Sequence, residues 1–195
     1  MIYRLRGLKL IRSREIIREY LSSGLKYNGI FLLSCGNAYH SLAEIAHPLS
    51  IKVIGLSTSH RFNGSVQLED RLYTSQELTR LYPGHLNATP GALRERTMRR
   101  VGADIYLWLR SRGYHGERLI VPVGSGETIT ALSNYIPESK LVGFCCDDYP
   151  PIRFDYSPLK PSVETHFRVL KLDGLRSIRD ASYLAERGES FLLTE

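Results

Sequence analysis

Short apolar runs alternate with longer amphipathic segments along most of the chain. Each run is followed by glycine or polar residues, which is typical of buried strands; they lie at Gly29–Ser34, Ile51–Ser57, Arg118–Val123 and Leu141–Cys146. Between them, apolar residues recur at helical spacing, as in Ser13–Ser23. This alternation predicts an α/β fold class, namely a three-layer α/β/α sandwich with a mainly parallel central sheet.

The remaining segments complete this pattern with less regular sequence. Residues 58–88 are the least regular part, with a short helix expected in TSQELTRLY and capped near Thr74. A long helix is expected after Pro90, with its inner face formed by Met98, Val101, Ile105 and Leu109. A proline-rich passage then crosses to HFRVLKL, and SIRDASYLAER is expected as a last helix before FLLT. A length of 195 residues fits a single compact domain over 1–195.

Composition narrows the class of protein. The chain is 43% hydrophobic and 24% charged, as in ordinary globular proteins. No apolar run approaches the roughly 20 residues of a membrane span, and arginines interrupt the N-terminal segment, so we expect a cytoplasmic protein. Three cysteines, two of them adjacent, give neither a disulfide framework nor metal-ligand spacing.

The net charge of +6 raises the question of nucleic-acid binding. The basic residues are scattered from Arg4 to Arg187 without a dense block, which does not favour that function. The same charge suits an anionic small ligand. Tyr106 and Trp108 are expected in a helix core or at an interface. A homodimer is a separate expectation.

A first candidate site lies in LLSCGNAYHSLAEIA, residues 32–46. A small polar turn between a strand and a helix leaves backbone N–H groups free beside the positive end of the helix dipole, and such turns bind carboxylates and phosphates. The alternative is that Ser34 or Asn37 only caps the helix. For His40, one turn into this helix, a structural role is favoured over catalysis.

A second candidate site lies in VPVGSGETITAL, residues 121–132. Gly124 and Gly126 permit tight backbone turns, and Ser125 and Thr128 add hydroxyl donors, so the segment is suited to hold a phosphate. It lacks the lysine of a Walker loop, and Thr130-Ala131 stands where a dinucleotide fingerprint has its third glycine. The alternative is a tight turn without a ligand.

Together the two segments resemble the fold-type II pyridoxal-phosphate enzymes, the superfamily of cysteine synthase, threonine synthase and the tryptophan synthase beta chain. In that family an SSGN- or TSGN-type loop holds the substrate carboxylate, and its asparagine contacts the cofactor; a VGTGGTITG-type loop holds the cofactor phosphate. KLVGFCCDD and RSIRDASYLAERGESFLL resemble later parts of the family. Residues 57–85 fall outside the resemblance and would replace part of the family's small mobile domain.

The resemblance implies pyridoxal phosphate as cofactor and an amino acid as substrate. It assigns the substrate to Ser34, Cys35, Gly36 and Asn37, and the cofactor to Asn37, Gly124, Ser125, Gly126, Glu127 and Thr128. It places the catalytic Schiff-base lysine at Lys9, just ahead of the helix that ends at Gly24. Imine formation needs some neutral amine, which partial desolvation would supply. The asparagine, threonine and serine of the family's lysine segment are absent, so a surface lysine is the alternative.

Two further departures keep a second hypothesis open. Glu127 stands where the family has glycine, and its carboxylate would repel a phosphate unless it turns outward or meets an arginine. The chain ends at Glu195, about where the family's SSG segment would meet the pyridine nitrogen.

The first hypothesis is thus an enzyme of amino-acid elimination or replacement, and the second is an inactive relative that binds anions or a partner. A nucleotide- or nucleic-acid-binding α/β domain is the third. For the first two, we expect turns 34–37 and 124–128 at the C-terminal edge of one parallel sheet.

Overall fold

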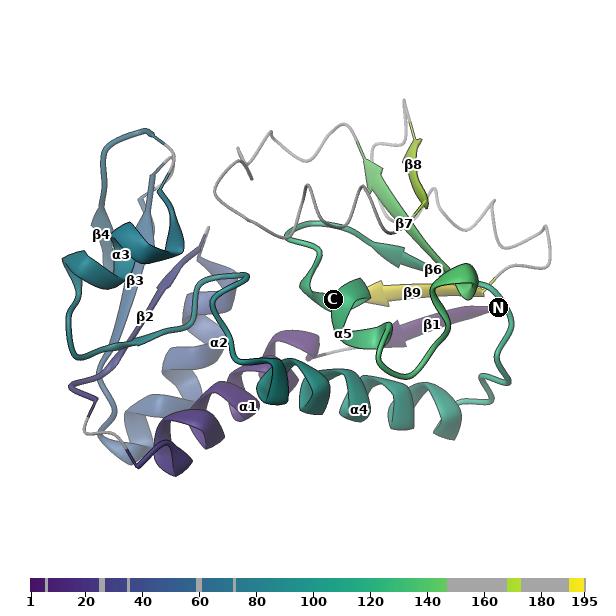
Figure 1. Cartoon of the computed structure of the whole chain (residues 1–195), viewed down its shortest axis with the longest axis horizontal. Coiled ribbons are helices and arrows are strands. Elements are labelled where there is room, and N and C mark those ends of the chain that lie inside the picture. The colour runs from purple at the N-terminus through teal and green to yellow at the C-terminus, as the bar shows by residue number, and fades with distance from the viewer. Residues whose placement is uncertain are drawn as a thin grey trace. The chain divides into compact units, whose positions relative to one another are not determined.

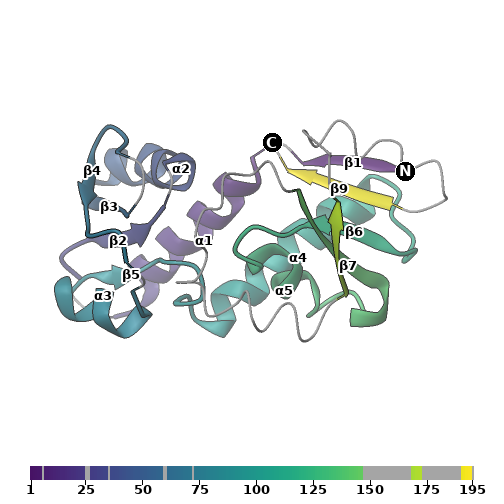
Figure 2. The same ribbon diagram turned by 90° about the horizontal axis from the view of Figure 1, so that it is seen from above.

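The computed structural model describes residues 1–5, 7–24, 27–34, 36–58, 61–71, 73–146, 168–172 and 190–194. These residues form two compact units. Unit 1 contains Met1–Leu8 and the described residues from Met98 onward, and unit 2 contains Lys9–Thr97. Figures 1 and 2 together label the helices and strands of each unit.

Unit 2 is built on a four-stranded sheet in the order β4-β3-β2-β5. The strands are β2 (Ile30–Leu33), β3 (Val53–Ser57), β4 (Ser65–Gln67) and β5 (Leu86–Asn87), and all their pairings are parallel. The helices are α1 (Leu8–Ser22, in unit 2 from Lys9 on), α2 (Asn37–Ala46) and α3 (Ser75–Leu81), with a 3-10 turn η1 at His47–Leu49.

Helices α2 and α3 lie on opposite faces of this sheet (Figure 2). On one face, Phe31 and Leu33 of β2 form a buried cluster with Leu56, Tyr73 and Leu78, the last of which belongs to α3. On the other face Gly55 of β3 lies under a side chain of α2, as described below. Because neighbouring residues of a strand point to opposite faces, the two helices bury alternate positions. Unit 2 is therefore a three-layer α/β/α arrangement.

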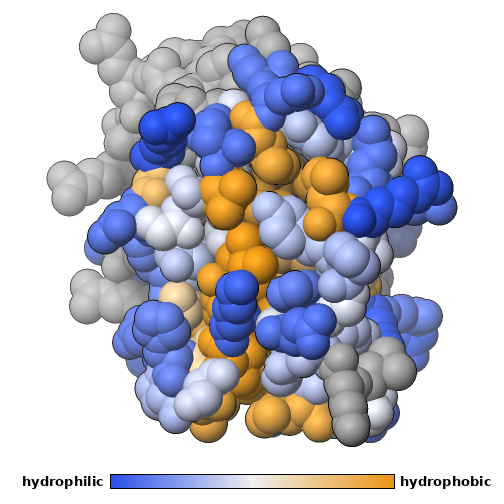
Figure 3. Space-filling view, turned by 90° about the vertical axis from the view of Figure 1, so that its left-hand side faces the viewer, coloured by the Kyte–Doolittle hydropathy of each residue, from blue (hydrophilic) through white to orange (hydrophobic). Residues whose placement is uncertain are grey.

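Part of the apolar surface of unit 2 stays uncovered. Ile54, Leu68 and Tyr82 pack against the buried cluster but are only partly buried. Val66 is 43% exposed and Leu81 is 53% exposed. Figure 3 shows a band of apolar side chains bordered by polar ones on the end of the molecule it presents. Apolar surface of this kind is common on folded proteins and assigns no function by itself.

Unit 1 is built on a five-stranded sheet in the order β1-β9-β6-β7-β8, again with parallel pairings. The strands are β1 (Ile2–Leu5), β6 (Leu119–Pro122), β7 (Leu141–Cys146), β8 (Arg168–Leu172) and β9 (Ser190–Thr194). The helices are α4 (Glu95–Ser111, in unit 1 from Met98 on) and α5 (Glu127–Leu132), with a 3-10 turn η2 at Glu138–Lys140.

Helix α4 packs closely on α5. The predicted inner face of α4 is largely confirmed, since Val101, Ile105 and Leu109 are buried. Between the helices, a methyl group built on Gly102 would lie 2.1 Å from the Ala131 carbonyl oxygen, so only glycine fits there.

Glu117 joins three strands at the amino edge of this sheet, just before β6. Its carboxylate accepts hydrogen bonds from the Tyr3 hydroxyl (3.0 Å) of β1, the Ser190 hydroxyl (2.8 Å) of β9 and the His115 N–H (3.0 Å). Burial alone would raise the pKa of Glu117, but these hydrogen bonds, together with one to backbone at Glu117, lower it to about 2. The ionised carboxylate therefore stabilises this edge of the sheet.

The predicted α/β class, with parallel strands flanked by helices, is confirmed. The expectation that turns 34–37 and 124–128 follow strands of one sheet is wrong, because β2 belongs to the four-stranded sheet and β6 to the five-stranded one. The physical reason is that apolar runs predict strands but not their partners, which tertiary packing selects. The predicted helix SIRDASYLAER lies outside the described residues. That 1–195 forms a single domain, with 57–85 replacing part of a mobile one, stays a prediction.

Candidate functional site

The turn after β2 has a backbone conformation that requires glycine. Gly36 has φ 117° and ψ −55°, and it directly precedes α2. The Ser34 N–H donates to the Leu56 carbonyl of β3 (3.0 Å), and the Gly36 N–H donates to the Ser34 hydroxyl oxygen (3.0 Å). The Ser34 hydroxyl therefore closes the turn locally. Cys35 lies outside the described residues.

Helix α2 begins without a side-chain cap. Gly36 occupies the N-cap position and no side-chain hydrogen bond caps it. The N-cap residue is therefore Gly36 and neither Ser34 nor Asn37; Asn37 is exposed, and its carbonyl accepts from the Ser41 hydroxyl (3.0 Å). The first-turn amides thus keep the positive end of the helix dipole available for an anion such as a carboxylate.

The turn after β6 has the same construction. The Val123 N–H still donates to the Phe144 carbonyl of β7 (2.8 Å), and Gly126 (φ 84°) then takes the N-cap position of α5, again without a side-chain cap. Gly124 is exposed, and Ser125 and Thr128 are half-buried. Backbone amides and two hydroxyl groups are the donors that a phosphate group requires.

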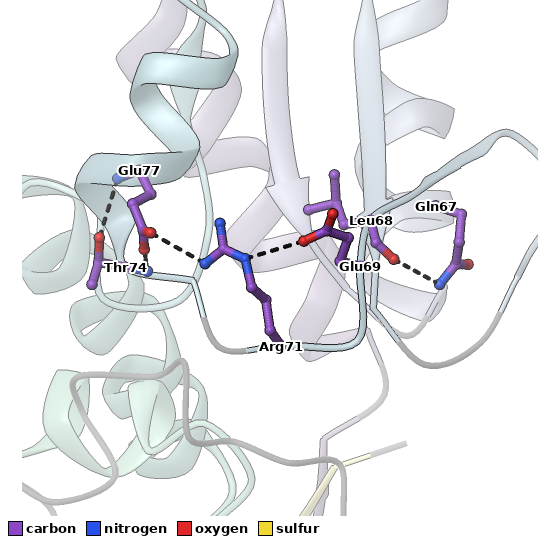
Figure 4. Close-up of polar contacts among 6 residues, drawn as sticks. All are labelled: Gln67, Leu68, Glu69, Arg71, Thr74 and Glu77. Atoms are coloured by element: carbon purple, nitrogen blue, oxygen red, sulfur yellow. Dashed lines mark hydrogen bonds and ion pairs between the residues drawn. The ribbon is translucent and has the colours of Figure 1, made fainter.

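Helix α3 shows what a capped helix looks like in the same chain. The Thr74 hydroxyl accepts from the Glu77 N–H (3.1 Å), and the Glu77 carboxylate accepts from the Thr74 N–H (2.7 Å), a complete capping box. Arg71 bridges this carboxylate and that of Glu69 (Figure 4). The bonds from Thr74, followed by that from Arg71, lower the pKa of Glu77. The prediction of a cap near Thr74 is confirmed, and both candidate turns lack such a cap.

Glu127 is the residue of the second turn that fits a phosphate least well. Its side chain is buried, with 9% of its surface exposed. The arrangement in which the carboxylate turns out to solvent is therefore excluded. The alternative that an arginine meets the carboxylate stays a prediction; without such a cation, a phosphate at this turn would be repelled by a buried charge that water screens poorly.

Lys9 lies in the first turn of α1 and is exposed. Helix α1 begins at Leu8, five residues before the predicted start, so Lys9 is helical instead of lying on a strand or turn. The strand before it is β1, and Gly7 (φ 78°) leads from that strand into the helix. Because β1 and β6 run parallel in one sheet, the strands that precede Lys9 and turn 124–128 end at the same sheet edge.

An aromatic cluster beside the first turn was missed by sequence reasoning, which weighed His40 alone. It consists of Tyr39, His40 and Phe62. The available signal was Gly55, since a glycine inside a strand often marks the close approach of another group. Within the described residues, there is no cluster of His, Cys, Asp or Glu suited to a metal ion. No helix in the described part of the chain is long and apolar enough to cross a membrane.

Comparison with known proteins gives a fold. No family model and no curated protein sequence matches the chain. Among solved structures, it is similar to an O-acetylserine-dependent cystathionine beta-synthase from Helicobacter pylori (TM-score 0.67, 13% identity, 99% of this chain and 85% of that one). It is also similar to a hydrogen sulfide-producing enzyme from Fusobacterium nucleatum (TM-score 0.66, 12% identity, 99% of this chain and 88% of that one). A threonine deaminase from T.th. is a third similar structure (TM-score 0.57, 13% identity, 97% of this chain and 85% of that one). The chain therefore has the fold of the fold-type II pyridoxal-phosphate enzymes.

Proposed function

We propose that the protein binds pyridoxal phosphate and acts on an amino acid by elimination or replacement at the β or γ carbon. The observation that carries this proposal is the shared construction of two turns. Each follows a buried parallel strand and opens a helix at a glycine without a side-chain cap. The fold supports the proposal, since similar solved structures include enzymes whose names refer to amino-acid substrates.

The cofactor's phosphate would be held by turn 124–128. Its backbone N–H groups would donate to the phosphate oxygens, and the Ser125 and Thr128 hydroxyl groups would add donors. Gly126 has a left-handed backbone conformation that other residues adopt only with strain. Without a side chain, it also lets the backbone come close to a ligand. Buried Glu127 is the one member of the turn that opposes a dianion.

The substrate would be held by turn 34–37 and the cofactor ring by its neighbours. Ser34, Cys35 and Gly36 would hold the substrate carboxylate, and Asn37 would donate to the phenolic oxygen of the cofactor ring. Lys9 would supply the amine that binds the cofactor covalently. When bound, the cofactor supplies an electron-withdrawing ring that stabilises negative charge on the substrate's α carbon.

A catalytically inactive relative is the second candidate, and one observation favours it. A buried carboxylate at position 127 would oppose a phosphate at turn 124–128, whereas an anion at the first turn would not be affected by it. Such a protein would keep its uncapped turns as an anion- or partner-binding module. Binding of phosphate without any covalent attachment of pyridoxal phosphate would support this candidate.

Titration with pyridoxal phosphate, followed by visible absorbance, tests the proposal. The parent should develop a saturable band of lysine-bound cofactor, and Lys9→Ala should lose it because the attaching amine is gone. Lys140→Ala is a matched control, since Lys140 is also exposed but precedes β7 at the opposite edge of the sheet. A band that is lost only when a lysine other than Lys9 is changed would refute the assignment of Lys9 as the attachment site. The absence of a band at any cofactor concentration would refute the proposed enzymatic function.

A further inference from the structure

Two aromatic rings in unit 2 occupy the space left by three glycines. A methyl group built on Gly55 of β3 would lie 2.7 Å from Tyr39 Cδ2 and 2.8 Å from Phe62 Cζ. One built on Gly64 would lie 2.5 Å from the Tyr39 hydroxyl oxygen, and one on Gly36 would lie 3.4 Å from Phe62 Cγ. The rings therefore rest directly on the backbone of β3 and of the turn that opens α2.

The rings contact one another, and the backbone at Phe62 is anchored outside turn 34–37. The centroids of Tyr39 and Phe62 are 5.2 Å apart, and His40 stands edge-on to both at 5.2 and 5.9 Å. The Phe62 N–H donates to the Ser65 hydroxyl (3.1 Å), and the Ser65 N–H donates to the Phe62 carbonyl (3.0 Å). This tight turn fixes the backbone that presents Phe62.

Phe62 lies against Gly36 at the point where the chain changes from strand to helix. The Gly36 N–H is bonded to Ser34, and its carbonyl accepts from the His40 N–H (2.9 Å). On the side from which a side chain would project, the Phe62 ring fills the space instead. A glycine at φ 117° has no side chain that could restrict its backbone, so the ring adds a contact to the two hydrogen bonds that hold Gly36.

We propose that Phe62, supported by Tyr39, is a positioning residue that fixes Gly36 at the start of α2, so that the first-turn N–H groups of this helix face the carboxylate of the substrate. This inference rests on the proposed function. The cluster is not simply core, because Tyr39 and Phe62 are only half-buried and His40 is exposed. Both rings lie against glycine backbone, Phe62 at Gly36 and Gly55 and Tyr39 at Gly55 and Gly64.

Amide hydrogen exchange of Gly36 and His40 tests the positioning without any ligand. In Phe62→Leu both amides should exchange about tenfold faster, the effect expected from losing roughly one aromatic contact. Val66→Ala, an exposed change on the neighbouring strand β4, should leave them unchanged. Gly55→Ala displaces both rings without deleting either and should act like Phe62→Leu. Unchanged exchange rates of these amides in Phe62→Leu would overturn the inference. If Gly55→Ala does not fold, the result for Phe62→Leu alone decides.

Binding of L-serine to the protein loaded with pyridoxal phosphate supplies the second readout. Phe62→Leu should weaken the affinity for L-serine severalfold. The affinity for pyridoxal phosphate should stay unchanged, because turn 124–128 follows a strand of the other sheet. Faster exchange with unchanged L-serine affinity would overturn the inference. If the parent binds pyridoxal phosphate but no L-serine, the substrate role of the turn fails separately, and the exchange comparison still decides whether Phe62 orders it.

Discussion

Gly102→Ala should destabilise unit 1, although alanine is the better helix former. The added methyl group would lie 2.1 Å from the Ala131 carbonyl oxygen and 2.7 Å from its carbonyl carbon. Both are backbone atoms of α5, which must move by about 1.3 Å before an ordinary contact of 3.4 Å is reached. Tyr135 Cε2, at 3.1 Å, limits that movement on a second side.

Two opposing effects determine how much Gly102→Ala changes the free energy of unfolding. Overpacking costs about 1–3 kcal/mol, and the clash with backbone places this case near the upper end. Alanine recovers roughly 1 kcal/mol of helix propensity. The net loss in the free energy of unfolding should therefore be about 2 kcal/mol, or a fall in Tm of roughly 4–8 °C for a chain of this size.

Urea unfolding followed by fluorescence measures this loss, because the single tryptophan, Trp108, lies on the same helix. Leu107→Ala is the matched control: its side chain is 65% exposed on α4, so stability should change by less than about 0.5 kcal/mol. A Gly102→Ala protein as stable as the parent, or more stable, would refute the close approach of α4 and α5.

Three further changes test other parts of the structure. The lowered pKa of Glu117 stabilises the protein above about pH 4.5, and this contribution is lost as pH falls toward 2. In Glu117→Gln, the free energy of unfolding by urea should therefore depend less on pH between about 4.5 and 2. An unchanged pH dependence would contradict the role given to Glu117. Thr74→Ala removes half of a capping box and should cost about 1 kcal/mol in urea unfolding, whereas exposed Gln76→Ala should be neutral. Glu127→Gln should tighten inorganic phosphate or pyridoxal-phosphate binding at least about tenfold in a titration, since a poorly screened repulsion of roughly 1.4 kcal/mol or more is removed; equal affinity would place the carboxylate away from the anion.

The strands were predictable where they are long and apolar. The boundaries of β7 match the predicted run at Leu141–Cys146, and Gly24 (φ 66°) follows the end of α1 as expected. Strands β4 and β5 were missed because they have three and two residues, too few for a pattern to appear. The two-sheet arrangement was missed because partner choice depends on tertiary packing.

The candidate turns were found because glycine and small polar residues mark them locally. What lies against them was not predictable. Phe62 is far from Gly36 in sequence, and no local pattern relates the two. The helical state and exposure of Lys9 likewise depended on where α1 begins, and helix starts are poorly fixed by sequence when no capping residue marks them.

Borohydride reduction of the protein with pyridoxal phosphate, followed by peptide mass mapping, tests the central claim most directly. Reduction makes a lysine-bound cofactor permanent, so its position can be read from the modified peptide. We expect one modified site, at Lys9, and protection from modification when excess inorganic phosphate competes at turn 124–128. Modification spread over several exposed lysines, unaffected by phosphate, would contradict a built pyridoxal-phosphate site in this chain.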